Sequence, residues 1–180
     1  LILTLMAPSC TNDSPEIMVY ETSESGYKLT QVTEFKVLEN PTSITLDTSK
    51  ELQTISGFGG AFTESSAYLL NQISKENRDK ILRAYFAKEG ARYSLTRTHM
   101  NSCDFSLSNY SYTPVVGDKN LEHFSIDEDK DDIIPMIKDA MAVSDDGFRL
   151  FASPWTAVPW MKDNNNWVGG KLLPEYYDTW

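Results

Sequence analysis

The chain has 180 residues and a formal net charge of −10, from 16 lysine and arginine residues against 26 aspartate and glutamate residues. This acidic balance argues against nucleic acid as a partner, because phosphate binding needs a basic face. It argues equally against electrostatic docking on an anionic membrane leaflet. With 41% hydrophobic and 23% charged residues, the composition is typical of a globular protein and not of a disordered one.

The first residues look like the end of a secretory signal peptide. Residues 1–8 are apolar, but they are far fewer than the roughly 20 residues that span a bilayer. A small residue before Cys10 resembles the lipoprotein box of exported bacterial proteins, although Ala7 and Pro8 depart from its usual pattern. We therefore predict that residues 1–16 are a signal remnant and linker, that Cys10 is lipidated, and that the protein is exported to the bacterial periplasm or cell surface. A buried edge strand is the alternative interpretation of the apolar run.

Residues 17–52 have the pattern of short, paired strands. The turn residues Gly26, Asn40-Pro41 and Asp47-Thr-Ser separate short apolar runs, some of them alternating. These runs are Met18–Tyr20, Tyr27–Val32, Phe35–Val37, Ile44–Leu46 and Leu52–Ile55. The last of them extends beyond residue 52. They predict a small antiparallel sheet.

From Gln53 onward, strands and helices alternate. The predicted strands are a run over 54–61 that leads into a glycine-rich turn, a second strand over 93–97 and a third over 147–152. Predicted helices cover 64–71 and 75–88, the latter capped by Ser74, and a third helix follows the capping-box pattern Ser125-Ile-Asp-Glu128. This β-α-β-α-β order favours parallel strands in one sheet or barrel.

Motifs for metals and common cofactors fail on inspection. The glycines at 57–60 fit neither the dinucleotide fingerprint nor the P-loop, because Phe62 stands where a small residue is needed and no Lys-Ser/Thr follows. Three alternating aspartates over 127–131 resemble the start of a calcium loop, but its glycine position holds Asp132, so we interpret them as a solvated acidic helix start. With His99 and His123 as the only histidines, an imidazole metal site is not expected. We predict no metal and no cofactor.

Three motifs in fixed order carry a more specific signal. They are Gly57-Phe-Gly-Gly-Ala-Phe-Thr-Glu64, then Arg97-Thr-His-Met-Asn-Ser-Cys-Asp-Phe-Ser106 followed by Tyr110-Ser-Tyr112, and last Ala152-Ser-Pro-Trp-Thr-Ala-Val-Pro-Trp-Met-Lys162. In this order and spacing, the chain from about Gln53 to Trp180 resembles glycoside hydrolase family 30, the glucosylceramidase-like enzymes.

The resemblance implies a fold. Residues 53–180 would form about the first three βα units of a (β/α)₈ TIM barrel, truncated at Trp180. Residues 17–52 would supply the N-terminal strands of an accessory β-sandwich. The order of strands and helices predicted from the residues themselves agrees with this arrangement.

The resemblance also implies a sugar-binding site at the carboxyl ends of the barrel strands. The family aspartate that matches Asp104 grips the terminal glucose, Trp155 offers an N–H donor and an apolar wall, and Phe105 lines the pocket. The arginine that matches Arg97 lies beside the catalytic glutamates, while Trp160 either packs beneath its loop or lines the entrance. The plainer alternative is that Asp104 is a turn residue and that the tryptophans belong to the core.

The catalytic residues themselves are missing from the chain. Retaining glycosidases need two carboxyl groups, one as acid/base and one as nucleophile. In the family these are glutamates, the first in an Asn-Glu-Pro motif after the fourth strand and the second after the seventh. No Asn-Glu-Pro occurs here, so we assign no catalytic residue and expect both glutamates beyond Trp180. The start at Leu1 and the incipient helix at Trp180 indicate a fragment, which we expect to be inactive by itself.

We therefore expect the full-length protein to be a retaining β-glycosidase. Its substrate would be a β-glucoside, such as the glycolipid glucosylceramide or a β-1,6-linked glucan, and the sequence favours neither. It would touch a membrane only through a lipid anchor on Cys10. The alternative from a different class is a non-catalytic carbohydrate-binding surface lipoprotein on a degenerate barrel, which the sequence downstream of Trp180 would distinguish by lacking Asn-Glu-Pro.

Overall fold

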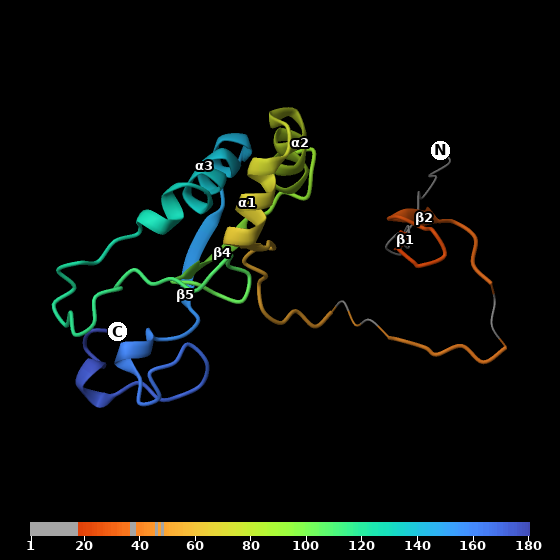
Figure 1. Ribbon diagram of the computed structural model, residues 1–180. Coiled ribbons are helices and arrows are strands. Elements are labelled where there is room, and N and C mark those ends of the chain that lie inside the picture. Colours follow the sequence, from red (N-terminus) through yellow and green to blue (C-terminus); the bar gives the residue numbers. More distant parts are fainter. Residues whose placement is uncertain (1–17, 37–38, 46, 48) are drawn as a thin grey trace, which may run out of the picture. The chain divides into compact units, whose positions relative to one another are not determined.

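The computed structural model describes residues 18–36, 39–45, 47 and 49–180. The chain divides into two compact units, Leu1–Leu52 and Gln53–Trp180 (Figure 1). The predicted signal remnant and the predicted lipidation of Cys10 lie outside the described residues. No helix in the described part of the chain combines the length and the apolar character needed to cross a membrane.

The first unit contains one antiparallel strand pair. Strand β1 (Val19–Glu21) pairs with β2 (Thr30–Val32), and Val19 lies opposite Val32. These two strands confirm the first two predicted runs. The run Leu52–Ile55 was predicted wrongly as a strand, because none of its residues has a strand partner. In the runs Phe35–Val37 and Ile44–Leu46, residues 37 and 46 lie outside the described residues, and the described ones have no strand partner. The exposed fractions of Ile44 (84%) and Leu52 (89%) show why, since apolar side chains that pack against nothing give a strand no stabilisation.

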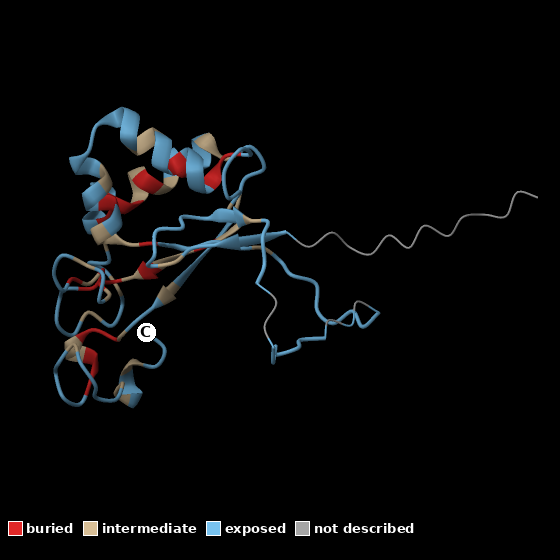
Figure 2. Cartoon of the chain, turned by 90° about the vertical axis from the view of Figure 1, so that its right-hand side faces the viewer, coloured by how far each residue is buried: buried red, intermediate tan, exposed pale blue. Residues whose placement is uncertain are grey.

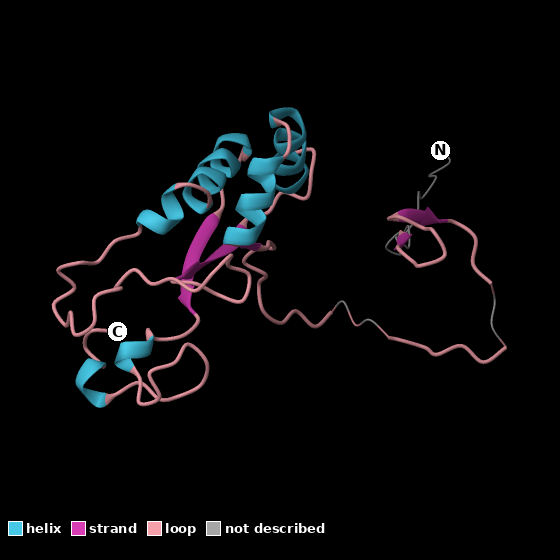
Figure 3. Ribbon diagram, viewed as in Figure 1, coloured by secondary structure: helices cyan, strands magenta, loops and turns pink. Residues whose placement is uncertain are grey.

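The second unit is built on a parallel sheet. Strands β3 (Ala61–Phe62), β4 (Leu95–Met100) and β5 (Arg149–Pro154) lie in the order β3-β4-β5, and both pairings are parallel (Figure 3). The register aligns Ala61, Arg97 and Phe151 across the sheet. The predicted succession of parallel βα units is therefore confirmed, while the first strand begins at Ala61 and not at residue 54.

Glycines bring the segment before β3 against β4. The carbonyl of Phe58 accepts a hydrogen bond from the Ser94 N–H (2.9 Å), and the carbonyl of Gly60 accepts one from the Arg97 N–H (3.1 Å). A Cβ on Gly59 would lie 1.8 Å from the carbonyl oxygen of Leu95, which is far shorter than a van der Waals contact between these atoms. Gly59 is therefore required for the close approach of this segment to β4.

Three helices lie along one side of this sheet (Figure 1). They are α1 (Glu64–Gln72), α2 (Lys75–Phe86) and α3 (Ile133–Val143). Ser74 caps α2 by accepting a hydrogen bond from the Asn77 N–H, as predicted. Thr63 caps α1 in the same way by accepting a hydrogen bond from the Ser66 N–H.

The start of α3 differs from the prediction. The hydroxyl of Ser125 accepts a hydrogen bond from the Asp127 N–H (3.1 Å) and opens only a short 3₁₀ helix, η1 (Asp127–Lys130). Asp132 is the residue that caps α3. The acidic stretch is also not uniformly solvated, because Asp129 is only 7% exposed. Two further 3₁₀ turns follow β5, η2 (Pro159–Met161) and η3 (Pro174–Tyr176), the second lying where the incipient helix was expected.

The hydrophobic core lies between the helices and the sheet. Buried residues (red in Figure 2) lie in the helices and at the end of β3, while β5 is almost entirely exposed. The core cluster consists of Phe62, Ala67, Leu82, Phe86, Ile133, Met136 and Ala140. The rings of Phe62 and Phe86 stack with centroids 5.5 Å apart.

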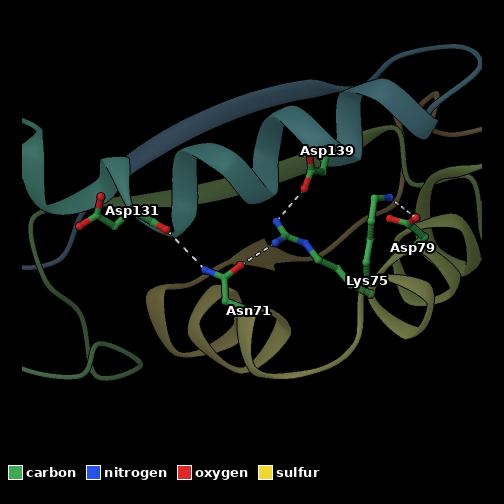
Figure 4. A network of polar contacts seen from close by, with 6 residues as sticks. Asn71, Lys75, Asp79, Asp131 and Asp139 are labelled. Atoms are coloured by element: carbon green, nitrogen blue, oxygen red, sulfur yellow. Dashed lines mark hydrogen bonds and ion pairs between the residues drawn. The ribbon is translucent and has the colours of Figure 1, made fainter.

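A polar network joins the three helices at the edge of this core (Figure 4). The guanidinium of Arg78 on α2 donates to the side-chain oxygen of Asn71 on α1 (2.6 Å) and pairs with Asp139 on α3 (2.7 Å). Asn71 in turn donates to the backbone carbonyl of Asp131 (3.4 Å). These bonds fix the three helices relative to one another.

Candidate functional site

The candidate site lies at the carboxyl edge of the parallel sheet. The last residues of β4 and β5, Met100 and Pro154, are paired neighbours. The segments that follow them therefore leave the sheet at the same edge, as in other parallel βα folds. All four predicted site residues lie on these strands or in the segments that follow them.

Arg97 and Trp155 are brought into direct contact. The guanidinium carbon of Arg97 lies 5.2 Å from the centroid of the Trp155 ring, within the range of a cation–π interaction. The indole is 44% exposed, so one part of its surface is free to meet a ligand. Within the described part of the chain, Arg97 forms no ion pair, and its donors therefore stay available for a carboxylate.

Asp104 and Phe105 lie in the segment that follows β4. Both side chains are exposed, and the Asp104 carboxylate has no hydrogen-bond or ion-pair partner among the described residues. The backbone next to it is firmly held, because the carbonyl of Phe105 accepts hydrogen bonds from both the N–H (3.0 Å) and the hydroxyl (2.7 Å) of Ser65. The carboxylate of Glu64 accepts a further bond from the Leu107 N–H (2.8 Å). A free carboxylate on a held backbone is suited to bind ligand hydroxyls.

The structure thus joins only part of the predicted site directly. Arg97 and Trp155 touch, whereas Asp104 and Phe105 share their edge of the sheet without a contact to Trp155 among the described hydrogen bonds and ring contacts. The assignment of these four residues to one sugar site stays a prediction.

A small cavity adjoins Trp155. Its volume is about 250 Å³. Its walls are Pro154, Trp155, Thr156, Ala157, Lys162, Gly169, Gly170, Leu172 and Trp180. An indole face beside polar groups can receive a sugar ring or part of a glycan.

Lys162 organises the segment after β5, a role that sequence reasoning missed. Its ammonium is buried and donates to the hydroxyl of Thr156 (2.9 Å) and to the carbonyls of Trp167 (2.9 Å) and Gly169 (3.0 Å). Burial lowers the pKa of this ammonium below its usual value. Lys162 ends the third family motif, and this was the only signal in the sequence that could have pointed to it.

Trp160 connects the two segments at this edge. Its indole N–H donates to the backbone carbonyl of Thr113 (3.0 Å), and its ring meets Tyr176 edge-on with centroids 5.0 Å apart. The side chain is half-buried in this arrangement. This favours packing beneath the loop over a place at the entrance.

A buried polar cluster supports the segment after β4, and it too was missed. Nδ1 of the buried His99 lies 2.6 Å from the carbonyl oxygen of Asn101, and Nε2 accepts a hydrogen bond from the Glu64 N–H (3.3 Å). A carbonyl only accepts, so the imidazole carries its proton on Nδ1. Both ring nitrogens are therefore occupied by backbone groups. Across the described residues, no group of three or more histidine, cysteine, aspartate or glutamate side chains is arranged to hold a metal ion.

The family follows from comparison with known proteins. Residues 55–180 match the model described as the glycosyl hydrolase family 30 TIM-barrel domain. The chain belongs to glycosyl hydrolase family 30. The sheet β3-β4-β5 and its helices are thus part of a family 30 TIM-barrel domain, as the three motifs predicted.

Relatives of this chain include proteins named glucosylceramidase and proteins named endo-β-1,6-glucanase. Lysosomal acid glucosylceramidase of Mus musculus is 39% identical over 71% of this chain and 25% of its own length. The solved structure of the endo-β-1,6-glucanase BT3312 shares 32% identity with a TM-score of 0.70, over 90% of this chain and 36% of that one. SrfJ from Salmonella typhimurium shares 38% identity with a TM-score of 0.66, over 71% and 29%. The chain spans between 24% and 35% of the length of the curated relatives that it matches.

Proposed function

We propose that this chain is the N-terminal part of a retaining β-glycosidase that hydrolyses β-glucosides. The observation that carries the proposal is the contact between Arg97 and Trp155 at the strand edge from which the Asp104 segment also leaves. Membership of family 30 supports the reaction class. The relatives named glucosylceramidase and endo-β-1,6-glucanase support a β-glucoside as the substrate, and a glycolipid and a glucan are both compatible with the site.

Each residue has a role in the proposed site that follows from its chemistry. The free carboxylate of Asp104 accepts hydrogen bonds from two sugar hydroxyls, and the exposed face of Trp155 packs against the C–H face of the ring. Phe105 adds an apolar wall. Arg97 orients a catalytic glutamate supplied from beyond residue 180, because a guanidinium forms two parallel bonds to a carboxylate.

The N-terminal strands belong in this proposal to an accessory β-sandwich. The antiparallel pair β1–β2 supports it, because sandwiches are built from such pairs. We place the domain limits at residues 17–52 for these strands and 53–180 for the barrel.

Export and lipidation of Cys10 complete the proposal. The apolar run followed by a small residue and cysteine supports an anchored enzyme at the cell surface or in the periplasm. Radioactive fatty acid should label the wild-type protein in cells and should not label Cys10→Ala. Equal labelling of the two would refute the anchor without affecting the enzyme proposal.

The decisive experiment is an assay of Asp104→Ala in the full-length protein. Loss of a charged contact to the sugar should lower kcat/KM on an aryl β-glucoside by about a hundredfold or more, because such contacts strengthen in the transition state. Asp178→Ala removes an exposed aspartate elsewhere in the same unit and is the matched control. A loss below about threefold for Asp104→Ala would remove that residue from the site. Glucan binding without turnover by the wild-type protein would favour a non-catalytic carbohydrate-binding protein instead.

A further inference from the structure

A carboxylate is buried between two phenols next to the proposed site. Asp129 in η1 accepts a hydrogen bond from the Tyr110 hydroxyl at Oδ1 (2.7 Å) and another from the Tyr112 hydroxyl at Oδ2. All three residues are less than 10% exposed. Among the described residues no cation pairs with Asp129, so the two phenols alone compensate its removal from water.

The two phenols are permanent donors in this arrangement. Burial, the hydrogen bond to Asp129 and the charge of Asp129 all raise the pKa of Tyr110 and of Tyr112 well above the usual value for tyrosine. Both hydroxyls therefore keep their protons at neutral pH and donate them to the carboxylate. The bonds to the carboxylate are charge-assisted, and such bonds are about twice as strong as neutral ones.

The clasp, by which we mean Asp129 with Tyr110 and Tyr112, closes the base of the segment that carries Asp104. The Ser102 N–H donates to the carbonyl of Tyr110 (3.1 Å), and the Tyr112 N–H donates to the side-chain oxygen of Asn101 (2.8 Å). These bonds tie the two ends of residues 102–110 together. Because Asp129 comes from the approach to α3, the clasp also ties this closed loop to the helical layer.

A buried carboxylate is a costly way to close a loop. Apolar side chains of similar size would fill the same space without removing a charge from water, and such replacements are often neutral or stabilising. The carboxylate adds directional hydrogen bonds, because its two oxygens accept from the two tyrosine hydroxyls at once and so fix the orientation of both rings. Direction matters for a group that binds substrate, since a displacement of about 1 Å can cost about a hundredfold in rate.

We propose that Asp129 is a positioning residue, which holds Tyr110 and Tyr112 so that the loop of Asp104 and Phe105 keeps its substrate-binding conformation. This inference rests on the proposed glycosidase function and on the assignment of Asp104 to the sugar site. Asp129 touches no substrate itself and acts through this loop, chiefly through the charged contact that Asp104 makes.

The test is a double-mutant cycle in the full-length protein with Asp129→Asn and Asp104→Ala. In the wild-type background Asp129→Asn should lower kcat/KM on an aryl β-glucoside by about tenfold or more. In the Asp104→Ala background the same change should cost less than about twofold, because the group being positioned is gone. Equal losses in both backgrounds, or no loss in the first, would overturn the proposal.

Amide hydrogen exchange gives a second readout that does not need activity. Exchange over residues 102–110 should become faster in Asp129→Asn while the helices α1 and α2 keep their wild-type rates. Tyr177→Phe removes the hydroxyl of an exposed tyrosine and should change neither exchange nor activity. Unchanged exchange over 102–110 in Asp129→Asn would contradict the clasp.

Two further outcomes are covered by the same design. If Asp129→Asn fails to fold, Tyr112→Phe removes one of the two bonds and keeps the carboxylate and its bond to Tyr110, so the same cycle is run with it. If the wild-type protein hydrolyses no β-glucoside, the proposed function fails, while the exchange measurement still decides whether the clasp holds the loop.

Discussion

Two buried or half-buried cations at the carboxyl edge are used in opposite ways. The Lys162 ammonium donates three hydrogen bonds, all to uncharged oxygen atoms of its own segment, and so holds the loop next to Trp155 in shape. Arg97 stacks on the Trp155 ring and keeps its guanidinium donors free of described partners. Only the second arrangement leaves a charge ready for a carboxylate, which is why the proposed role beside a catalytic glutamate falls to Arg97 and not to Lys162.

At the residue scale, Asp132 makes a pH-dependent contribution to stability. Burial raises the pKa of its carboxyl above the usual 3.8, and the charges of Glu64, Asp129 and Asp131 act in the same direction. Between pH 3.8 and the raised pKa, the folded protein holds a proton that the unfolded chain has lost. The free energy of unfolding contributed by this group therefore falls as the pH rises through that window, and the ionised carboxyl is a cost at neutral pH.

Asp132→Asn should consequently raise the melting temperature of the full-length protein at pH 7. Asparagine caps helices about as well as aspartate, so α3 keeps its N-terminal acceptor without the buried charge. The advantage should disappear below pH 3.8, where both proteins carry a neutral side chain. Melting curves at several pH values check this, with the exposed neighbour variant Asp131→Asn as the control, for which we expect a smaller gain. A destabilised Asp132→Asn at pH 7 would contradict the sign.

At the scale of elements, hydrophobic periodicity predicted the three helices, because each has an apolar stripe that packs in the core, although α3 begins later than the capping box at Ser125 indicated. The strands β4 and β5 were also predicted to within a few residues, although neither contributes to the core cluster and β5 is almost entirely exposed. The run over 52–55 carries the same kind of pattern and forms no strand, since nothing packs on it. Periodicity reports what a segment is able to bury and does not report whether a partner exists.

The residues of the candidate site also differ in whether the sequence could predict them. Motif resemblance predicted Arg97, Asp104 and Trp155, whose side chains are at least partly exposed at the strand edge. Asp129 and Lys162 were missed, because a charged residue in a polar stretch is interpreted as solvated unless its tertiary partners are known. Tyr110 and Tyr112, which bury Asp129, lie 19 and 17 positions away from it.

The close approach of Gly59 to β4 leads to a prediction about the stability of the sheet. In Gly59→Ala the new Cβ would meet the carbonyl of Leu95 at 1.8 Å, so the segment before β3 must move away from β4. Because backbone on both sides cannot yield as a side chain does, we expect a loss of about 3 kcal/mol or more in the free energy of unfolding. Urea denaturation of the full-length protein measures this loss.

The neighbouring glycine supplies the matched control for that variant. A Cβ on Gly60 would lie 3.5 Å from the ring of Tyr93, which is ordinary van der Waals contact. Gly60→Ala should therefore fold with nearly wild-type stability. Equal stability of the two variants would show that the close approach of Gly59 to β4 does not limit the fold.

At the scale of the whole molecule, the described sheet has two unpaired edges. Strands β3 and β5 each pair on one side only, and the exposed fractions of Leu150 (42%) and Phe151 (49%) on β5 are large for apolar strand residues. Open, apolar edges of parallel sheets favour association with other chains. A TIM barrel closes such edges by pairing its first strand with its last, and its cooperativity depends on that closure.

Residues 53–180 expressed alone should therefore behave differently from the same residues within the full-length protein. We expect the isolated segment to bind a dye for exposed apolar surface, to aggregate at micromolar concentration and to melt without a cooperative transition. It should not turn over an aryl β-glucoside, since the two carboxyl groups that a retaining glycosidase needs are proposed to come from later strands. Differential scanning calorimetry beside the assay checks both expectations, with the full-length protein as the control. A sharp calorimetric transition in the isolated segment would show that three parallel strands and their helices suffice for folding, and turnover by a clean preparation would place the catalytic carboxyl groups within these residues.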